Sequence, residues 1–97
     1  MDFTNPFTGT GRKQLSGEAL AQAIRIDMAA ELDAINLYVT HLEGTDDPVI
    51  KGMIQHIVAE EKEHLAEFEQ ILLLLDRTQQ QKIREAQTEM QERKKAA

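Results

Sequence analysis

Apolar side chains recur at helical spacing along the first half of the chain. At about 100° of rotation per residue, one face of a helix over residues 16–43 collects an apolar stripe. This stripe consists of Leu20, Ile24, Met28, Ile35, Tyr38 and Leu42. Ser16 is a suitable N-cap, and Glu18 lies in the first turn, where the helix dipole favours negative charge. We therefore expect a long amphipathic helix that ends near Glu43.

A strong break separates this helix from a second one. Gly44 suits a C-cap, Asp47 an N-cap and Pro48 the first position of a helix. The second pattern runs to about Leu75, with an apolar stripe of Ile50, Ile54, Ile57, Phe68, Leu72 and Leu75. Two long helices with a short connection pack side by side, so residues 16–75 are expected to form an antiparallel hairpin.

The last segment, residues 76–97, contains good helix formers but little apolar surface. Its narrow stripe consists of Ile83, Ala86 and Met90. We expect a third, short and mostly exposed C-terminal helix, with Asp76 or Thr78 as its cap. The alternative is that this segment continues the second helix without a bend.

Residues 1–15 show no periodicity and are expected to form an irregular N-terminal arm. No strand pattern is found in the sequence, so the expected fold class is all-α. A chain of 97 residues makes one small domain with a marginal core, so self-association is expected.

Two glutamates and a histidine interrupt the apolar stripes. Glu31 lies in the middle of the first stripe, and Glu61 and His64 lie inside the second. An antiparallel hairpin that turns near Asp46 places residue 31 opposite residue 61, with His64 one turn further along the helix. We therefore expect these three ionisable side chains to meet at one point of the hairpin.

This group needs a partner, because an isolated charge in an apolar layer is costly. Neither stripe carries Lys or Arg at this level, since Arg25 and Lys62 point elsewhere. A cation is the natural compensation, and Glu61-x-x-His64 has the i, i+3 spacing at which two ligands reach one ion. Carboxylates with one imidazole favour iron or manganese over structural zinc, and the chain has no cysteine.

One chain supplies half of a di-iron carboxylate site, which requires two Glu and two Glu-x-x-His motifs from four helices. Two helices also leave a wide apolar face uncovered. Dimerisation into a four-helix bundle would correct both deficits, with the site on the two-fold axis.

Charge and composition argue against some classes of partner and location. A net charge of −6 argues against a nucleic-acid partner and suits a protein that attracts cations. The apolar runs are too short to span a membrane, and the N-terminus lacks the apolar core of a signal peptide. The expected location is the cytoplasm.

The pattern Glu31…Tyr38…Glu61-Lys62-Glu63-His64, on two helices joined by Thr45-Asp46-Asp47-Pro48, resembles the encapsulated ferritin family. The resemblance covers roughly residues 16–80. It implies a ferroxidase that oxidises Fe(II) to Fe(III) at a subunit interface, in a ring of dimers that is typically a decamer. The product passes to a surrounding encapsulin shell for storage, which implies a location inside an encapsulin nanocompartment.

The resemblance also implies roles for individual residues. Glu31, Glu61 and His64 would be the iron ligands, and other divalent cations are expected to substitute for iron in crystals. Tyr38 would lie beside the site, and Asp33 would attract incoming metal from the outer face. Two positions depart from the family pattern, since Ala30 replaces an outer acid and Leu37 an aromatic. The C-terminus shows no segment that resembles an encapsulin-targeting peptide.

Other interpretations of the same residues remain open. The protein could be a structural or adaptor bundle in which a metal, or a hydrogen-bonded polar network, only sets the register of the oligomer. It could also be a manganese or oxygen-activating oxidase acting on an organic substrate. Tyr38 could be an ordinary core tyrosine. His41 and His56 fall off both stripes and are expected to be surface residues.

Overall fold

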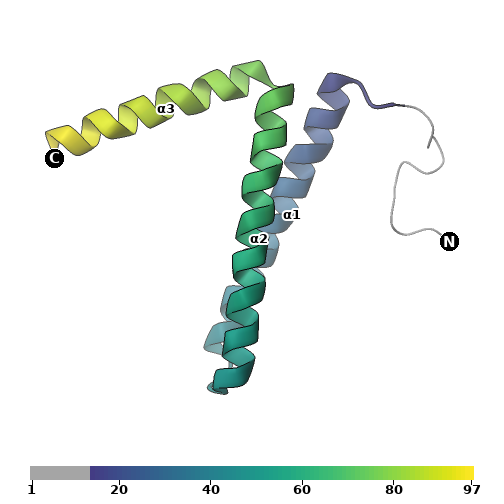
Figure 1. Ribbon diagram of the computed structural model, residues 1–97, viewed down its shortest axis with the longest axis vertical. Coiled ribbons are helices and arrows are strands. Elements are labelled where there is room, and N and C mark those ends of the chain that lie inside the picture. The colour runs from purple at the N-terminus through teal and green to yellow at the C-terminus, as the bar shows by residue number, and fades with distance from the viewer. Residues whose placement is uncertain (1–13) are drawn as a thin grey trace.

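The computed structural model describes residues 14–97, which fold into three helices and contain no strand. Helix α1 spans Gly17–Glu43, α2 spans Pro48–Leu75 and α3 spans Arg77–Ala96. Figure 1 shows α1 and α2 side by side, with α3 leaving the end of α2 and extending away from the pair. The all-α fold class is confirmed. The predicted N-terminal arm lies, over residues 1–13, outside the part of the chain that is described.

Polar caps fix the ends of α1 and α2. The Ser16 hydroxyl accepts a hydrogen bond from the Ala19 N–H at 3.1 Å. The Asp47 carboxylate accepts from the N–H groups of Val49 and Ile50 at 2.9 and 3.3 Å. These bonds satisfy donors that have no partner within the first turn of a helix, so both starts were correctly predicted.

Gly44 ends α1 as its C-cap, and its N–H donates to the carbonyl of His41 at 3.1 Å. Its φ of −88° is right-handed, so this glycine does not use the left-handed conformation that its residue type permits. The four residues from Gly44 to Asp47 reverse the chain and return α2 along α1.

The core of the hairpin is small. Ala21, Ile24 and Leu72 are buried together, and Met28, Phe68 and Leu75 pack around them. Val58 is a further buried residue on α2. The predicted stripes included Ile24 and Leu72, but they missed Ala21 and Val58, which lie toward one edge of each stripe.

Three residues of the predicted stripes stay exposed. Leu20, Ile50 and Ile57 retain 36, 48 and 38% of their accessible surface, although the stripes predicted them to be buried. One partner helix covers only one side of a stripe wider than 100°, so α1 and α2 bury their facing edges and leave the other edges bare. The uncovered edge also carries Met53 and Ile71, which are 60 and 41% exposed.

A single aspartate makes the corner between α2 and α3. The Asp76 N–H donates to the carbonyl of Leu72 at 2.8 Å, and one carboxylate oxygen accepts from the Gln79 N–H at 3.0 Å. The other oxygen accepts from Arg25 of α1 at 2.7 Å. The third helix therefore does not continue α2, and the predicted Asp76 cap is confirmed. No residue of α3 is buried.

None of the helices in residues 14–97 combines the length and the apolar character that crossing a bilayer requires.

We expect the charge of Asp76 to stabilise the fold in a pH-dependent way. The pKa of Asp76 lies below its ordinary value of 3.8, because the Gln79 N–H and then Arg25 favour the carboxylate. A folded pKa below the unfolded one stabilises the protein above the unfolded value, and this stabilisation is lost as the pH falls through the folded pKa. Asp76→Asn keeps a capping oxygen but loses the charge, so its melting temperature should fall at neutral pH and converge with wild type in acid.

Thermal unfolding followed by circular dichroism, from neutral pH to about pH 3, measures this difference. Asp46→Asn is the matched control, because Asp46 is exposed in the turn and makes no hydrogen bond or ion pair within residues 14–97. An Asp76→Asn difference that persists unchanged in acid would contradict the assigned role of the charge.

Candidate metal centre

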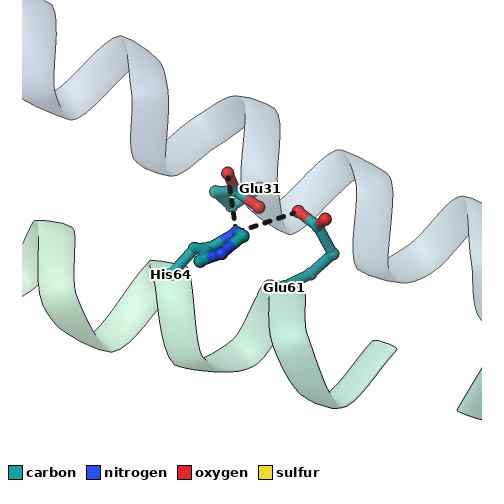
Figure 2. A group of neighbouring side chains, drawn as sticks. All are labelled: Glu31, Glu61 and His64. Carbon is teal, nitrogen blue, oxygen red and sulfur yellow. Dashed lines mark ion pairs between the residues drawn. The ribbon is translucent and has the colours of Figure 1, made fainter. Parts of the chain in front are cut away.

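The fold brings Glu31 of α1 to Glu61 and His64 of α2. Each of the three offers one ligand atom, and these atoms lie within 4.8 Å of one another. Figure 2 shows the Glu31 carboxylate entering from α1 and the other two side chains rising from neighbouring turns of α2. The antiparallel register and the i, i+3 spacing predicted this convergence.

The imidazole of His64 faces both carboxylates with the same nitrogen. Its Nδ1 lies 3.9 Å from Oε1 of Glu31 and 3.9 Å from Oε2 of Glu61 (Figure 2). These separations exceed hydrogen-bonding distance, which is about 2.7–3.2 Å for N–H···O. The histidine is therefore close to both acids without being hydrogen-bonded to either.

Burial differs across the group. The side chains of Glu31 and Glu61 are 17 and 21% exposed, whereas His64 is 48% exposed. The Oε2 atom of Glu31 is buried and has no hydrogen-bond partner among residues 14–97. A buried acceptor without a partner costs about 1–3 kcal/mol, and more when it is charged. A cation at this point would satisfy that oxygen, so the residues present fit a metal.

The pKa of Glu31 is raised above its ordinary value of 4.5. The largest cause is the neighbouring Glu61 carboxylate, with which a protonated Glu31 can share a hydrogen bond, followed by burial and by the negative charge of Glu61. His64 acts in the opposite direction, and Asp27 adds a further upward contribution. The folded chain without metal therefore disfavours two charged carboxylates at this point.

No lysine or arginine in residues 14–97 pairs with Glu31 or Glu61. Arg25 is bound to Glu18 at 3.2 Å and to Asp76 at 2.7 Å. The remaining cationic ion pairs lie within α3. The prediction that Arg25 points elsewhere is confirmed, and the two acids have no permanent cationic partner.

The donor set is two carboxylates and one imidazole, a combination typical of iron and manganese sites. It is half of the ligand set of a di-iron carboxylate bundle, in which two helices each supply a Glu and two others each supply Glu-x-x-His. A second copy of the same hairpin would complete that set.

Tyr38 and Asp33, which the sequence also nominated, lie outside the group of three. Tyr38 is half-buried on the same side of α1, with its ring centroid 6.1 Å from that of His41. Asp33 is exposed. His41 and His56 are exposed as predicted, and His56 lies 3.0 Å from Glu60. The roles predicted for Tyr38 and Asp33 stay predictions.

Sequence reasoning overlooked Asp27. This residue lies one turn before Glu31 and about 40° from it around the helix, on the predicted stripe. A rotation applied to every acidic residue of the first helix would have found it. Asp27 is exposed, and its negative charge acts on Glu31.

Comparison with known proteins gives three kinds of match. The family model described as "Ubiquinone biosynthesis protein COQ7" matches residues 18–92. The crystal structure of the encapsulated ferritin domain from Pyrococcus furiosus superposes with a TM-score of 0.78 at 33% sequence identity, covering 91% of this chain and 90% of that one.

Curated relatives are longer than this chain. The encapsulin nanocompartment cargo protein EncC of Myxococcus xanthus is 41% identical over 86 residues, which are 89% of this chain and 66% of the relative. Cargo protein EncB of the same organism is 40% identical over 53 residues, and the chain covers 34% of it. A ferritin-like-encapsulin shell fusion protein of P. furiosus is 36% identical over 72 residues, and the chain covers 21% of it.

The raised pKa of Glu31 predicts that this carboxylate destabilises the chain in the absence of metal. An acid whose folded pKa exceeds its unfolded pKa lowers stability above the unfolded value, whereas below that value both states are protonated and the penalty is absent. In a chelating buffer, Glu31→Gln should therefore melt at or above the wild-type temperature at neutral pH. This advantage should disappear as the pH falls below the ordinary value of 4.5.

Melting curves of both proteins over this pH range measure the effect. Glu63→Gln serves as the control, because it removes an exposed charge beside His64 on a different side of α2. A clear loss of stability in Glu31→Gln at neutral pH would instead indicate that Glu31 belongs to a structural polar network.

Proposed function

The chain belongs to the encapsulated ferritin family, and on that premise we propose that it is a ferroxidase. It would oxidise Fe(II) to Fe(III) at a di-iron centre completed by a second copy of the chain, for iron storage and detoxification. The observation that carries this proposal is the group of Glu31, Glu61 and His64, whose ligand atoms lie within 4.8 Å of one another and have no lysine or arginine partner in residues 14–97.

The surface around the three residues supports a two-chain site. Apolar side chains that stay exposed lie on the same side of the hairpin as His64. They are Leu20, Ile50, Met53, Ile57 and Ile71. A second hairpin packed on this face would bury them and would bring four carboxylates and two imidazoles together in a four-helix bundle.

Iron is the substrate in this proposal. The carboxylates of Glu31 and Glu61 bind Fe(II) and stabilise the more highly charged Fe(III) product by a larger electrostatic energy, which favours the loss of one electron from each iron. His64 supplies a neutral nitrogen ligand through its Nδ1, so it holds the ion without adding charge. Dioxygen or another oxidant takes up the electrons. Tyr38 would lie beside the site, and Asp33 would attract metal from the outer face.

The relatives support a setting for this activity. Two of them are encapsulin nanocompartment cargo proteins, and a third joins a ferritin-like part to an encapsulin shell. We propose that this chain acts within an encapsulin nanocompartment in the cytoplasm, as a ring of dimers that passes Fe(III) to the shell interior. A decamer is the expected form of this ring.

The match to the COQ7 family model favours a second candidate, a di-metal oxidase that activates oxygen toward an organic substrate. Both functions would use the same three residues. They differ in their product, because an oxidase consumes oxygen in proportion to an organic substrate, whereas a ferroxidase consumes it in proportion to Fe(II). The ferroxidase proposal rests in addition on the solved encapsulated ferritin domain, which matches over nine-tenths of both chains.

Removing a ligand should abolish rapid iron oxidation. We expect wild-type protein given Fe(II) in air to develop ferric absorbance quickly, and Glu61→Ala or His64→Ala to lose the fast phase. The loss should exceed the roughly 10–100-fold reduction that typically follows removal of a partner that only orients a ligand. Stopped-flow absorbance with an oxygen electrode measures the rate and the stoichiometry.

Matched controls come from the same helix. Glu63→Ala and His56→Ala remove exposed side chains of the same types and should keep the wild-type rate. Anomalous scattering at the iron edge from Fe(II)-soaked crystals should give two peaks near Glu31, Glu61 and His64 of paired chains. Wild-type rates in both ligand variants would remove the catalytic proposal.

Dimerisation can be tested without touching a ligand. Ile57 lies one turn before Glu61 and is 38% exposed, so Ile57→Glu would place a charge in the proposed interface. We expect this variant to keep its helical circular dichroism, to become monomeric by native mass spectrometry, and to lose stoichiometric iron binding although all three ligands remain. A monomeric variant with full iron binding would show that one chain suffices.

A further inference from the structure

The corner between α2 and α3 is a break in a helix that no helix-breaking residue imposes. Helix α2 ends at Leu75 and α3 begins at Arg77, so Asp76 alone leaves the helical conformation, with φ −124° and ψ 95°. The chain contains no glycine or proline after Gly52. Because proline and glycine are the usual causes of a sharp helix break, the bend has to be held by side-chain contacts.

The apolar pattern crosses this corner without losing its phase. The stripe of α3 consists of Ile83, Ala86 and Met90. When the rotation of about 100° per residue is continued from α2 through Asp76, this stripe falls within about 30° of the direction of the α2 stripe. One uninterrupted helix over residues 48–96 would therefore carry a single apolar face along its whole length.

The backbone hydrogen bonds at the corner also fit a continuous helix. The Asp76 N–H donates to the carbonyl of Leu72 at 2.8 Å, and the Asp76 carbonyl accepts from the Gln80 N–H at 3.0 Å. Both bonds have the spacing of four residues that an α-helix uses. A continuous helix would add bonds from the N–H groups of residues 77–79 to the carbonyls of residues 73–75. Straightening would therefore gain backbone bonds and keep those already present.

The contacts of one carboxylate oppose this straightening. One oxygen of Asp76 accepts from the Gln79 N–H at 3.0 Å, and the other accepts from Arg25 at 2.7 Å. Arg25 also binds Glu18 at 3.2 Å, so two acids hold its guanidinium in place. Within residues 14–97, α3 contacts only α2, and none of its residues is buried. The bend therefore depends on the cap and on the Arg25–Asp76 ion pair.

We propose that the corner is a two-state hinge, in which the Arg25–Asp76 ion pair holds α3 in the bent position and loss of that pair lets α2 and α3 merge into one helix over residues 48–96. In the bent state the two apolar stripes point in different directions (Figure 1). In the merged state α3 adds its stripe to the face of α2. The inference does not rest on the proposed function, since none of the three candidate metal ligands takes part in the hinge.

The test measures one distance in the full chain by pulsed electron paramagnetic resonance. The chain has no cysteine, so Gln55→Cys and Gln91→Cys place two spin labels at exposed positions of α2 and α3. In one straight helix these positions lie about 54 Å apart. In the bent chain, arms of about 31 and 22 Å meet at an angle, so the distance is clearly shorter (Figure 1). Labelled chain is diluted with unlabelled chain in a chelating buffer, so that only distances within one chain are measured.

The labelled chain without further changes should give the short distance. Asp76→Ala removes both the cap and the ion pair and inserts the best helix former, so most of the distribution should move to about 54 Å. Arg25→Gln keeps the cap but loses the ion pair, and it should give both distances. Two controls should keep the short distance, because Arg25→Lys retains the positive charge and Glu18→Gln retains the pair with Asp76.

Three results would overturn the hinge. The first is the long distance in the chain that carries only the labels, and the second is an unchanged short distance in both Asp76→Ala and Arg25→Gln. The third is a broad distribution with reduced helical circular dichroism in Asp76→Ala, which would mean that Asp76 only caps α3. Each of these results leaves the proposed metal site untouched, because none of the variants alters Glu31, Glu61 or His64.

Discussion

The hairpin depends on one electrostatic interaction, the repulsion between the carboxylates of Glu31 and Glu61. Two carboxylates and an imidazole meet between two helices. Within residues 14–97 no lysine or arginine neutralises them, and one oxygen of Glu31 is buried without a hydrogen-bond partner. In an apolar core such an arrangement is selected against unless something else supplies positive charge. A bound metal ion would do so, and the stability lost in its absence would become binding energy in its presence.

The same constraint explains why the hairpin has so small a core. If the site is shared between two copies, as proposed, it must lie at the surface of each, so the residues around it cannot be buried within one chain. Ala21, Ile24 and Leu72 hold the two helices together beside the site, whereas Met53 and Ile57 remain exposed on its other side. One second hairpin would thus both cover the exposed apolar surface and complete the ligand set.

Local rules predicted most of the fold. The caps Ser16, Asp47 and Asp76 and the break at Gly44 follow from the chemistry of helix ends, which acts over a few residues. The meeting of Glu31 with Glu61 follows from antiparallel register, which the short turn determines. What the sequence could not supply was the side of each stripe that the partner helix covers, because the stripes are wider than one contact.

Two further features depend on tertiary geometry. Ala21 is buried in one cluster with Ile24 and Leu72, and a hydrophobic pattern weighted toward large residues does not predict this. The direction of α3 is set by the contact of Asp76 with Arg25, which are distant in sequence. Asp27 is a different case, since the helical rotation alone predicts its position one turn before Glu31, nearer the edge of the stripe.

The corner at Asp76 determines the direction of α3 relative to the hairpin. One residue ends α2, caps α3 and binds Arg25 of α1, so a single residue connects the hairpin to its third helix. A helix of 20 residues is about 30 Å long, and α3 extends over this length from the Asp76 cap. This corner therefore sets the distance and orientation of the apolar stripe of Ile83, Ala86 and Met90 relative to the Glu31–Glu61–His64 group. In any assembly joined through α3, the conformation at Asp76 would therefore determine the spacing between neighbouring Glu31–Glu61–His64 groups.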